Sequence, residues 1–342
     1  SSRSSLHFQS DPFATGWEYE FATETLKYHV MDQITLGDLL VSLGWKGVRV
    51  TNQALPIVQG SLPAGTIRSQ DWFQPQVGLL YRLTPDAELF ANYTENMAAF
   101  VSAATAGPFS TNQTGFNAIR NTLKPESSKT VEGGARLRSG AFQGALAGYY
   151  VDFSNRLLAV QVGSAIQGNP SALQNVGSVR SWGIEASGLY TVLPGLTLHA
   201  SYAYNDTSYR DDVVNGDGVL VAAIKGKTAV DSPHHIASGD ISYDGDIFFA
   251  RLGANYMSKR YYTYTNDMWV GERVLVDASL GAKVPQGHGF LSGFAIEVSA
   301  TNLFDKDYVS TVGSGGFGNK GDGQTLLPGA PQQFFVTIRR GF

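Results

Sequence analysis

Apolar and polar residues alternate with a period of two through most of the chain, and this alternation is the strongest constraint on its fold. In LTLHASYAYN, for example, Leu196, Leu198 and Tyr202 lie on one face, while His199 and Ser201 lie on the other. Such a period is typical of a β-strand with two unlike faces. The pattern predicts about 13 strands, centred on residues 17–30, 39–51, 72–84, 87–99, 127–139, 142–160, 174–193, 196–211, 234–244, 247–264, 271–284, 290–311 and 330–342.

The connections between these strands alternate between short turns and long loops. Short turns are predicted at 84–87, 139–140, 193–195, 244–246 and 285–289, and long loops at about 53–71, 100–126, 161–173, 212–233, 265–270 and 312–329. This asymmetry is typical of outer-membrane barrels, which have short periplasmic turns and long extracellular loops. A β-sandwich also alternates, but it seldom keeps every long loop at one pole. We therefore predict an all-β, antiparallel transmembrane β-barrel segment over residues 1–342, with long extracellular loops.

Composition narrows the function classes. The formal net charge is −4, so the chain has no basic footprint for nucleic acid. It contains no cysteine, which excludes disulfides and thiolate metal sites. Charged residues make up 16% of the chain, and no run of about 18 apolar residues suggests a spanning helix.

The final strand indicates an orientation. Because the last predicted loop is long and therefore outside, this strand runs inward, with four apolar residues on the lipid face: Phe334, Val336, Ile338 and Phe342. Arg340 shares that face and is tolerated only near the interface, where such a charge costs about 0–1 kcal/mol. Thirteen strands that end inside must begin outside, whereas a complete bacterial barrel has an even number. We therefore expect at least one preceding strand to be missing from the sheet.

Several motifs, in order along the chain, resemble TonB-dependent outer-membrane receptors. They are PQVGLLYRLTPDAELFANYTEN, LKPESSKTVEGGARL, YYVDFSNRL, NVGSVRSWGIEASGLYTVLPGLTLHASYAYND, DSPHHIASGDISY and NLFDKDY, followed by the terminal PGAPQQFFVTIRRGF. The resemblance implies a 22-stranded barrel whose lumen is filled by an N-terminal plug. This chain would supply about the last 13–14 strands, with the plug and the early strands absent from it. The terminal aromatic residue resembles the signal that the barrel-assembly machinery recognises.

The resemblance also implies a function. Such receptors sit in the outer membrane of Gram-negative bacteria as multi-pass proteins, surrounded by its lipid. They take up a scarce solute, above all a ferric siderophore or another metal chelate, with energy supplied through the plug by the TonB complex. Two passive alternatives remain open, a porin-like channel and an autotransporter translocator barrel. What precedes the barrel distinguishes them: a plug, a passenger domain or a signal peptide alone.

The stretch SKRYYTYTNDMW holds the candidate ligand-binding residues. Arg260, Tyr262 and Tyr264 cluster at the predicted extracellular end of a strand. At the lumen mouth, Arg and Tyr side chains hold an anionic or catecholate-like ligand by charge-assisted hydrogen bonds and stacking. The alternative is that these aromatic residues belong to the upper girdle at the membrane interface.

Other motifs predict no catalytic, metal or cofactor site. GSGGFG (313–318) matches a dinucleotide-binding pattern, but no helix follows it, so we interpret it as a loop. His234 and His235 are adjacent on a strand and point to opposite faces, so they cannot share a metal. His199 and Ser201 share a face, but they are too far apart for a nucleophile and its base, and no third residue orients them. We therefore predict that the protein is not an enzyme.

Overall fold

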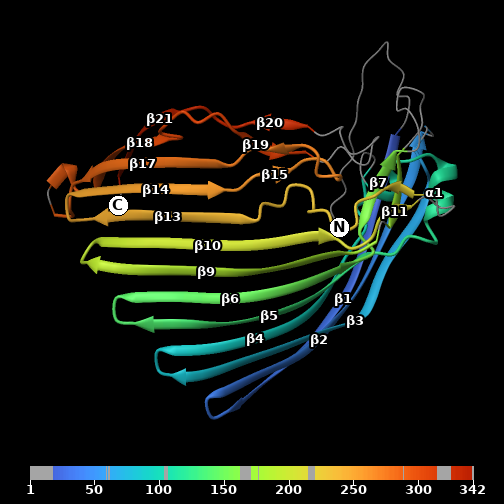
Figure 1. Cartoon of the computed structure of the whole chain (residues 1–342), viewed down its shortest axis with the longest axis horizontal. Helices are drawn as coiled ribbons and strands as arrows, with labels where there is room; N and C mark the ends of the chain where they lie inside the picture. Colours follow the sequence, from blue (N-terminus) through green and yellow to red (C-terminus); the bar gives the residue numbers. More distant parts are fainter. Residues whose placement is uncertain are drawn as a thin grey trace.

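One large antiparallel sheet dominates the molecule. The computed structural model describes residues 18–58, 60, 62–103, 107–161, 171–175, 177–214, 220–287, 289–313 and 325–340. In the sheet, thirteen strands follow one another in chain order. Their bounds are β1 Glu18–Leu36, β2 Leu39–Val58, β3 Gly65–Thr84, β4 Ala87–Ala98, β5 Glu126–Ser139, β6 Phe142–Ser154, β9 Val179–Leu193, β10 Leu196–Tyr209, β13 His235–Asp244, β14 Phe248–Met257, β17 Arg273–Lys283, β18 Phe294–Thr301 and β21 Gln333–Arg340. Figure 1 shows an open, curved sheet with β1 and β21 at its edges, which confirms the predicted antiparallel meander.

Short turns lie at one end of the sheet, which we call the turn end. Gly37 and Gly140 open two of these turns with φ angles of 61° and 56°. A glycine with positive φ at the first turn position matches the twist of the flanking strands, and another residue there would be strained. These tight connections force consecutive strands to pair, so the sheet is built locally along the chain.

The long connections lie at the opposite end, the loop end, and they carry structure of their own (Figure 1). Four two-stranded hairpins form there: β7 Leu157–Gln161 with β8 Ser171–Asn175, β11 Val213–Val214 with β12 Leu220–Ala222, β15 Arg260–Tyr261 with β16 Trp269–Val270, and β19 Val309–Val312 with β20 Leu326–Pro328. Between β4 and β5 lie the 3₁₀ turn η1 (Gly107–Phe109) and the short helix α1 (Gln113–Ile119). A second 3₁₀ turn, η3 (Gly289–Leu291), lies between β17 and β18 at the turn end.

Within the described ranges, the structure contains no helix of the length and apolarity needed to cross a membrane.

Several predicted boundaries were wrong at the loop end. The predicted loop 53–71 is mostly strand, because β2 continues to Val58 and β3 begins at Gly65. Conversely, the strands predicted over 142–160, 247–264 and 290–311 are each broken into two shorter ones, and the strand predicted from 174 begins only at Val179. Asn155 and Asn302, with φ angles of 56° and 48°, turn the chain out of the sheet at two of these breaks. Apolar alternation is weak at this end of the sheet, so it does not mark where these strands begin and end.

The strands of the sheet have one apolar and one polar face, as predicted. Residues paired across neighbouring strands share a face, so the register connects Leu198, Ile241 and Leu252 on the apolar side. The same register places His199 with Asp240 on the polar side. Large exposed side chains cover the apolar face of the sheet, among them Tyr190, Leu198, Ile241, Phe248, Leu252, Leu280, Ile296 and Val298.

Among the described residues, the buried apolar side chains lie toward the loop end. The rest of the sheet, which we call the wall, has no such cluster. One cluster, which we call the β10 cap, contains Val179, Tyr209, Val213, Ile224, Ala229 and Tyr264. The other, the β3 cap, contains Ala54, Ile67, Phe100, Phe109 and Phe116. The sheet below them is a single layer, so its side chains face either the polar interior or the surroundings of the apolar face.

Candidate functional site: the polar face and the loop end

A hollow of about 420 Å³ lies on the polar face across β10, β13, β14, β17 and β18. Its lining residues with ionisable side chains are His199, Asp240, Arg251, Asp277 and Glu297. These residues come from five consecutive strands of the sheet and share a face because of the register. The hollow is therefore a direct product of strand alternation, without any loop contribution.

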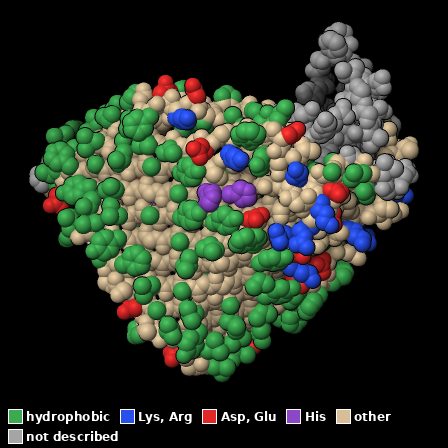
Figure 2. Space-filling view, viewed as in Figure 1, with side chains coloured by type: hydrophobic (Ala, Val, Ile, Leu, Met, Phe, Trp, Pro, Cys, Tyr) green, Lys and Arg blue, Asp and Glu red, His purple; other side chains and the backbone are tan. Residues whose placement is uncertain are grey.

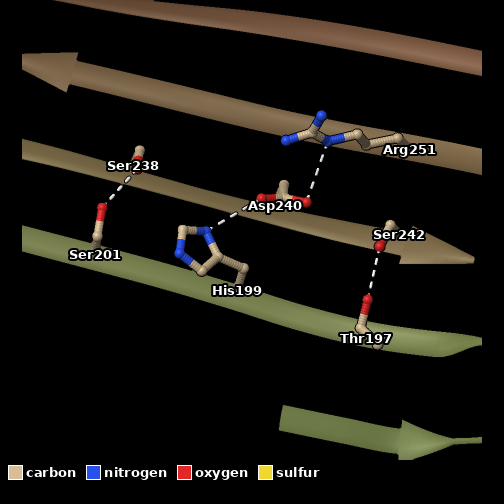
Figure 3. Close-up of polar contacts among 7 residues, drawn as sticks. All are labelled: Thr197, His199, Ser201, Ser238, Asp240, Ser242 and Arg251. Atoms are coloured by element: carbon tan, nitrogen blue, oxygen red, sulfur yellow. Dashed lines mark hydrogen bonds and ion pairs between the residues drawn. The ribbon is translucent and has the colours of Figure 1, made fainter. Parts of the chain in front are cut away.

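Asp240 is the centre of this group (Figure 3). Its carboxylate accepts a hydrogen bond from Arg251 Nε at 3.1 Å and lies 3.3 Å from His199 Nδ1. The side chain of Asp240 is only 16% exposed, whereas that of Arg251 is 65% exposed. Each oxygen of the Asp240 carboxylate thus contacts one neighbour, whereas most of the Arg251 side chain is exposed on the polar face.

Hydroxyl pairs flank this group on both sides. Thr197 pairs with Ser242 and Ser201 pairs with Ser238, each with 2.7 Å between the oxygens (Figure 3). Asp240, on the neighbouring strand, is the partner of His199. The sequence pattern did not reveal this contact because the two residues lie on different strands. Ser201 bonds to Ser238 instead of to the imidazole. Polar side chains on neighbouring strands therefore pair with each other along this face of the sheet. None of these residues forms a nucleophile–base pair.

The predicted ligand residue Arg260 lies at the loop end, in an internal ion pair. Its Nη1 donates to Asp231 Oδ1 at 2.7 Å, and its Nη2 donates to the Val309 carbonyl at 2.9 Å. The arginine side chain is 7% exposed. These contacts join three loops, so the guanidinium fastens β15 to the segments before β13 and after β18. Asp231 has a φ of 58°, and the sequence analysis did not single it out.

Tyr264 and Tyr262 lie in different surroundings although they are two residues apart. Tyr264 is 3% exposed and packs in the β10 cap, where its ring lies 5.9 Å from that of Tyr209. Burial, with a smaller contribution from Tyr209, raises the pKa of Tyr264 to about 12. Tyr262 is half-buried, and its hydroxyl donates to Met268 Sδ at 3.3 Å. Of the three predicted residues, the structure leaves Tyr262 with the most accessible side chain.

Three carboxamide side chains tie the loops together, and the sequence analysis predicted none of them. Each carboxamide accepts from the backbone N–H and donates to the backbone C=O of one residue in another segment, as a neighbouring strand would. The pairs are Gln113 with Ala64, Asn175 with Lys124, and Asn266 with Thr228. Isolated Asn and Gln residues carry no sequence signal for such long-range pairing, because the partner is set by how the connecting segments fold.

The β3 cap holds the connection between β4 and β5 against the extended β2–β3 hairpin. Phe109 and Phe116 are fully buried, and their rings stack with centroids 5.1 Å apart. Asn112 caps α1 by accepting a hydrogen bond from the Gly115 N–H at 2.8 Å. The described part of this connection, predicted as a loop over 100–126, thus forms a layer with its own apolar core.

The predicted C-terminal signal lies on β21, except for Phe342, which falls outside the described residues. Phe334, Val336 and Ile338 are 65–68% exposed and share one face of the strand. Arg340 reaches the turn end of the same face, where it lies over the rings of Phe290 and Phe294 at 5.2 and 5.0 Å. The aromatic rings accommodate the guanidinium at the margin of the apolar face.

The remaining motifs have structural partners or lie outside the described ranges. His234 Nδ1 contacts the Asn205 carbonyl at 2.9 Å, and His235 Nδ1 contacts the Tyr202 hydroxyl at 2.8 Å. Where side chains are described, no three His, Asp or Glu residues are grouped to hold a metal ion. Residues 314–318 of the GSGGFG motif are not among the described residues.

The fold and the two faces agree with a comparison against known protein families. The model for "TonB dependent receptor-like, beta-barrel" matches residues 7–303. The chain belongs to this family. The resemblance inferred from the sequence motifs is thereby confirmed, and the family consists of transport receptors of the outer membrane rather than enzymes.

Individual relatives are distant and longer. The ferric-pyoverdine M114 receptor PbuA of Pseudomonas sp. (strain M114) is 26% identical over 270 residues, covering 76% of this chain and 30% of the relative. The ferrioxamine receptor of Yersinia enterocolitica is 27% identical over 135 residues, covering 39% of this chain and 18% of the relative. The siderophore receptor PiuA from Acinetobacter baumannii superposes with a TM-score of 0.73 at 17% identity, over 94% of this chain and 43% of PiuA. The chain therefore spans less than half the length of these proteins.

Proposed function

We propose that this chain is part of an outer-membrane receptor that takes up a ferric siderophore, energised through TonB. The observation that carries the proposal is family membership, together with curated relatives that are named as receptors for ferric-pyoverdine and ferrioxamine. The sheet with its apolar outer face suits the wall of such a barrel. Its structured loop end suits a binding mouth on the cell surface.

In this proposal the three predicted loop residues have different roles. Tyr262 offers its half-buried ring to the ligand, while Arg260 and Tyr264 hold the segment that carries it. Exposed β21 residues, with Phe342 after them, serve recognition by the barrel-assembly machinery. The plug that couples to TonB would come from the part of the receptor outside this chain.

The test uses the whole receptor in cells that depend on one ferric siderophore. Uptake is expected to saturate at low concentration and to stop when the inner-membrane energy source is removed, while surface binding persists. Uptake that rises linearly with concentration and ignores the energy source would instead identify a passive channel, because diffusion needs no coupling.

A second measurement tests whether Tyr262, at the loop end, contributes to siderophore binding. Tyr262→Ala is expected to weaken siderophore binding by about 1–3 kcal/mol if the tyrosine contacts the ligand through stacking or a charged hydrogen bond. Hydrogen exchange over 258–270 serves as the control, since this variant should leave that segment ordered. Unchanged affinity in an ordered segment would remove Tyr262 from the binding site.

A further inference from the structure

Two adjacent histidines, His234 and His235, lie against the ring of Tyr204. Alternation puts neighbouring residues on opposite faces only within a regular strand, and β13 begins at His235, so alternation does not constrain His234. The ring of His235 lies 5.3 Å from that of Tyr204, its register partner on β10, and the ring of His234 lies 6.3 Å from the same tyrosine ring. Figure 2 shows two histidine side chains next to each other, in agreement with these contacts. The two imidazoles therefore belong to one patch, which we call the histidine pair.

Both rings of the histidine pair are held through the same nitrogen, Nδ1. His234 Nδ1 lies 2.9 Å from the Asn205 carbonyl oxygen. Because a carbonyl oxygen only accepts, this Nδ1 carries the proton, and the neutral ring then has its lone pair on Nε2. His235 Nδ1 lies 2.8 Å from the Tyr202 hydroxyl, which can accept a hydrogen bond in the same way. A hydrogen bond donated by one ring nitrogen orients most metal-ligating histidines and fixes the lone pair on the other nitrogen.

The Nε2 atoms of the histidine pair are open to a ligand from solution. Among the described residues, the side-chain hydrogen bonds of both histidines use Nδ1, and neither imidazole forms an ion pair. His235 is exposed and His234 is half-buried. His235 is also the first residue of β13, so the pair lies where the apolar face meets the loop end. A dissolved ion can therefore reach both rings.

We propose that His234 and His235 bind one divalent transition-metal ion, with Nε2 of each ring as a ligand and water completing the coordination. Imidazole suits Zn²⁺, Cu²⁺ and Ni²⁺, and Cu²⁺ binds such nitrogen ligands most tightly. Mg²⁺ and Ca²⁺ prefer oxygen ligands, so two imidazoles discriminate against them. The histidine pair lies apart from the polar hollow and from Tyr262, so this site is independent of the proposed siderophore function.

The experiment titrates Cu²⁺ into the whole receptor, purified without a histidine tag in a non-ionic detergent. Calorimetry measures the affinity, and pulsed electron paramagnetic resonance detects the imidazole nitrogens around the bound ion. The parent is expected to hold a Cu²⁺ ion through two imidazoles. His234→Gln and His235→Gln should each lose about tenfold or more in affinity, because each removes one of the two protein ligands. His29→Gln, which removes a histidine of β1, is the matched control and should bind like the parent.

Three outcomes would overturn the proposal. A signal from a single imidazole in the parent, or a loss confined to one of the two variants, would show a lone surface histidine instead of a shared site. Unchanged affinity in both variants would place the Cu²⁺ elsewhere on the receptor. The resonance signal of the parent requires no substitution, so it tests the proposal even if a variant folds poorly. Tyr202→Phe keeps both ligands but removes the hydroxyl that orients His235, and it should weaken binding by about tenfold.

Discussion

The wall of the sheet and the caps at its loop end are held together by different physics. Along the wall, strands such as β14 bury almost nothing and are stabilised by backbone hydrogen bonds to both neighbours. The caps contain the buried apolar residues, packed as in a small soluble domain. The comparison teaches that, in the proposed receptor, lipid is the partner for the apolar side chains of the wall, whereas the chain's own loops are the partner at the loop end.

The largest effect is expected from emptying the core of the β3 cap. Phe116→Ala should lower the free energy of cap opening by about 3–5 kcal/mol, because it removes a fully buried ring stacked on Phe109. Hydrogen exchange over 107–123 in the whole receptor measures this opening. Amides of β14 serve as the control and should keep their protection. Equal loss of protection at both places would show that caps and wall unfold as one unit.

A charge on the apolar face tests the wall. Leu252→Arg should destabilise the receptor in phosphatidylcholine vesicles by about 2–4 kcal/mol, since the side chain lies in mid-strand between Ile241 and Ala278. Ser279→Arg, on the polar face of the neighbouring strand, is the matched control and should be tolerated. Urea titration measures both. The same penalty at the two positions would contradict the assignment of the faces.

Alkaline pH should loosen the β10 cap. Tyr264 has a raised pKa of about 12, so between pH 10 and 12 the opened chain loses the phenolic proton while the packed chain keeps it. Cap stability therefore falls as pH rises through this window, by up to about 2–3 kcal/mol. Limited proteolysis of the cap across this range measures the effect. A Tyr264→Phe variant should lack this contribution, and a parent cap with pH-independent stability would refute the prediction.

The smallest effect concerns the carboxamide contacts between loops. Asn175→Ala should destabilise the packing of β8 on the β4–β5 connection by about 1–2 kcal/mol, because two hydrogen bonds to Lys124 and one to the Asn155 carbonyl are lost. Hydrogen exchange at Lys124 reports the change. A result indistinguishable from the parent would mean that solvent replaces these bonds without loss.

The sequence by itself determined the wall. Period-two alternation and short turns are local properties, so they were enough to predict thirteen strands, their antiparallel order and the face on which Leu198, His199 and Leu252 lie. A one-residue error in register would move every apolar side chain to the polar side, which is why the pattern is so informative. The family motifs along these strands were recognisable for the same reason.

Only the tertiary structure decided what the loop end does with its residues. The Arg260 side chain bonds to Asp231 and Val309, and Tyr264 is buried against Tyr209, contacts that the sequence pattern, which made both residues candidates for ligand contact, did not reveal. Likewise, Glu95 and Arg180 lie in one row across the sheet only when β4, β5, β6 and β9 are placed in register. In the proposed receptor the loop end lies outside the membrane, where no lipid favours an apolar face. Local alternation therefore does not predict which side chains meet there. There the contacts depend on segments that are distant in sequence and meet only in the folded protein.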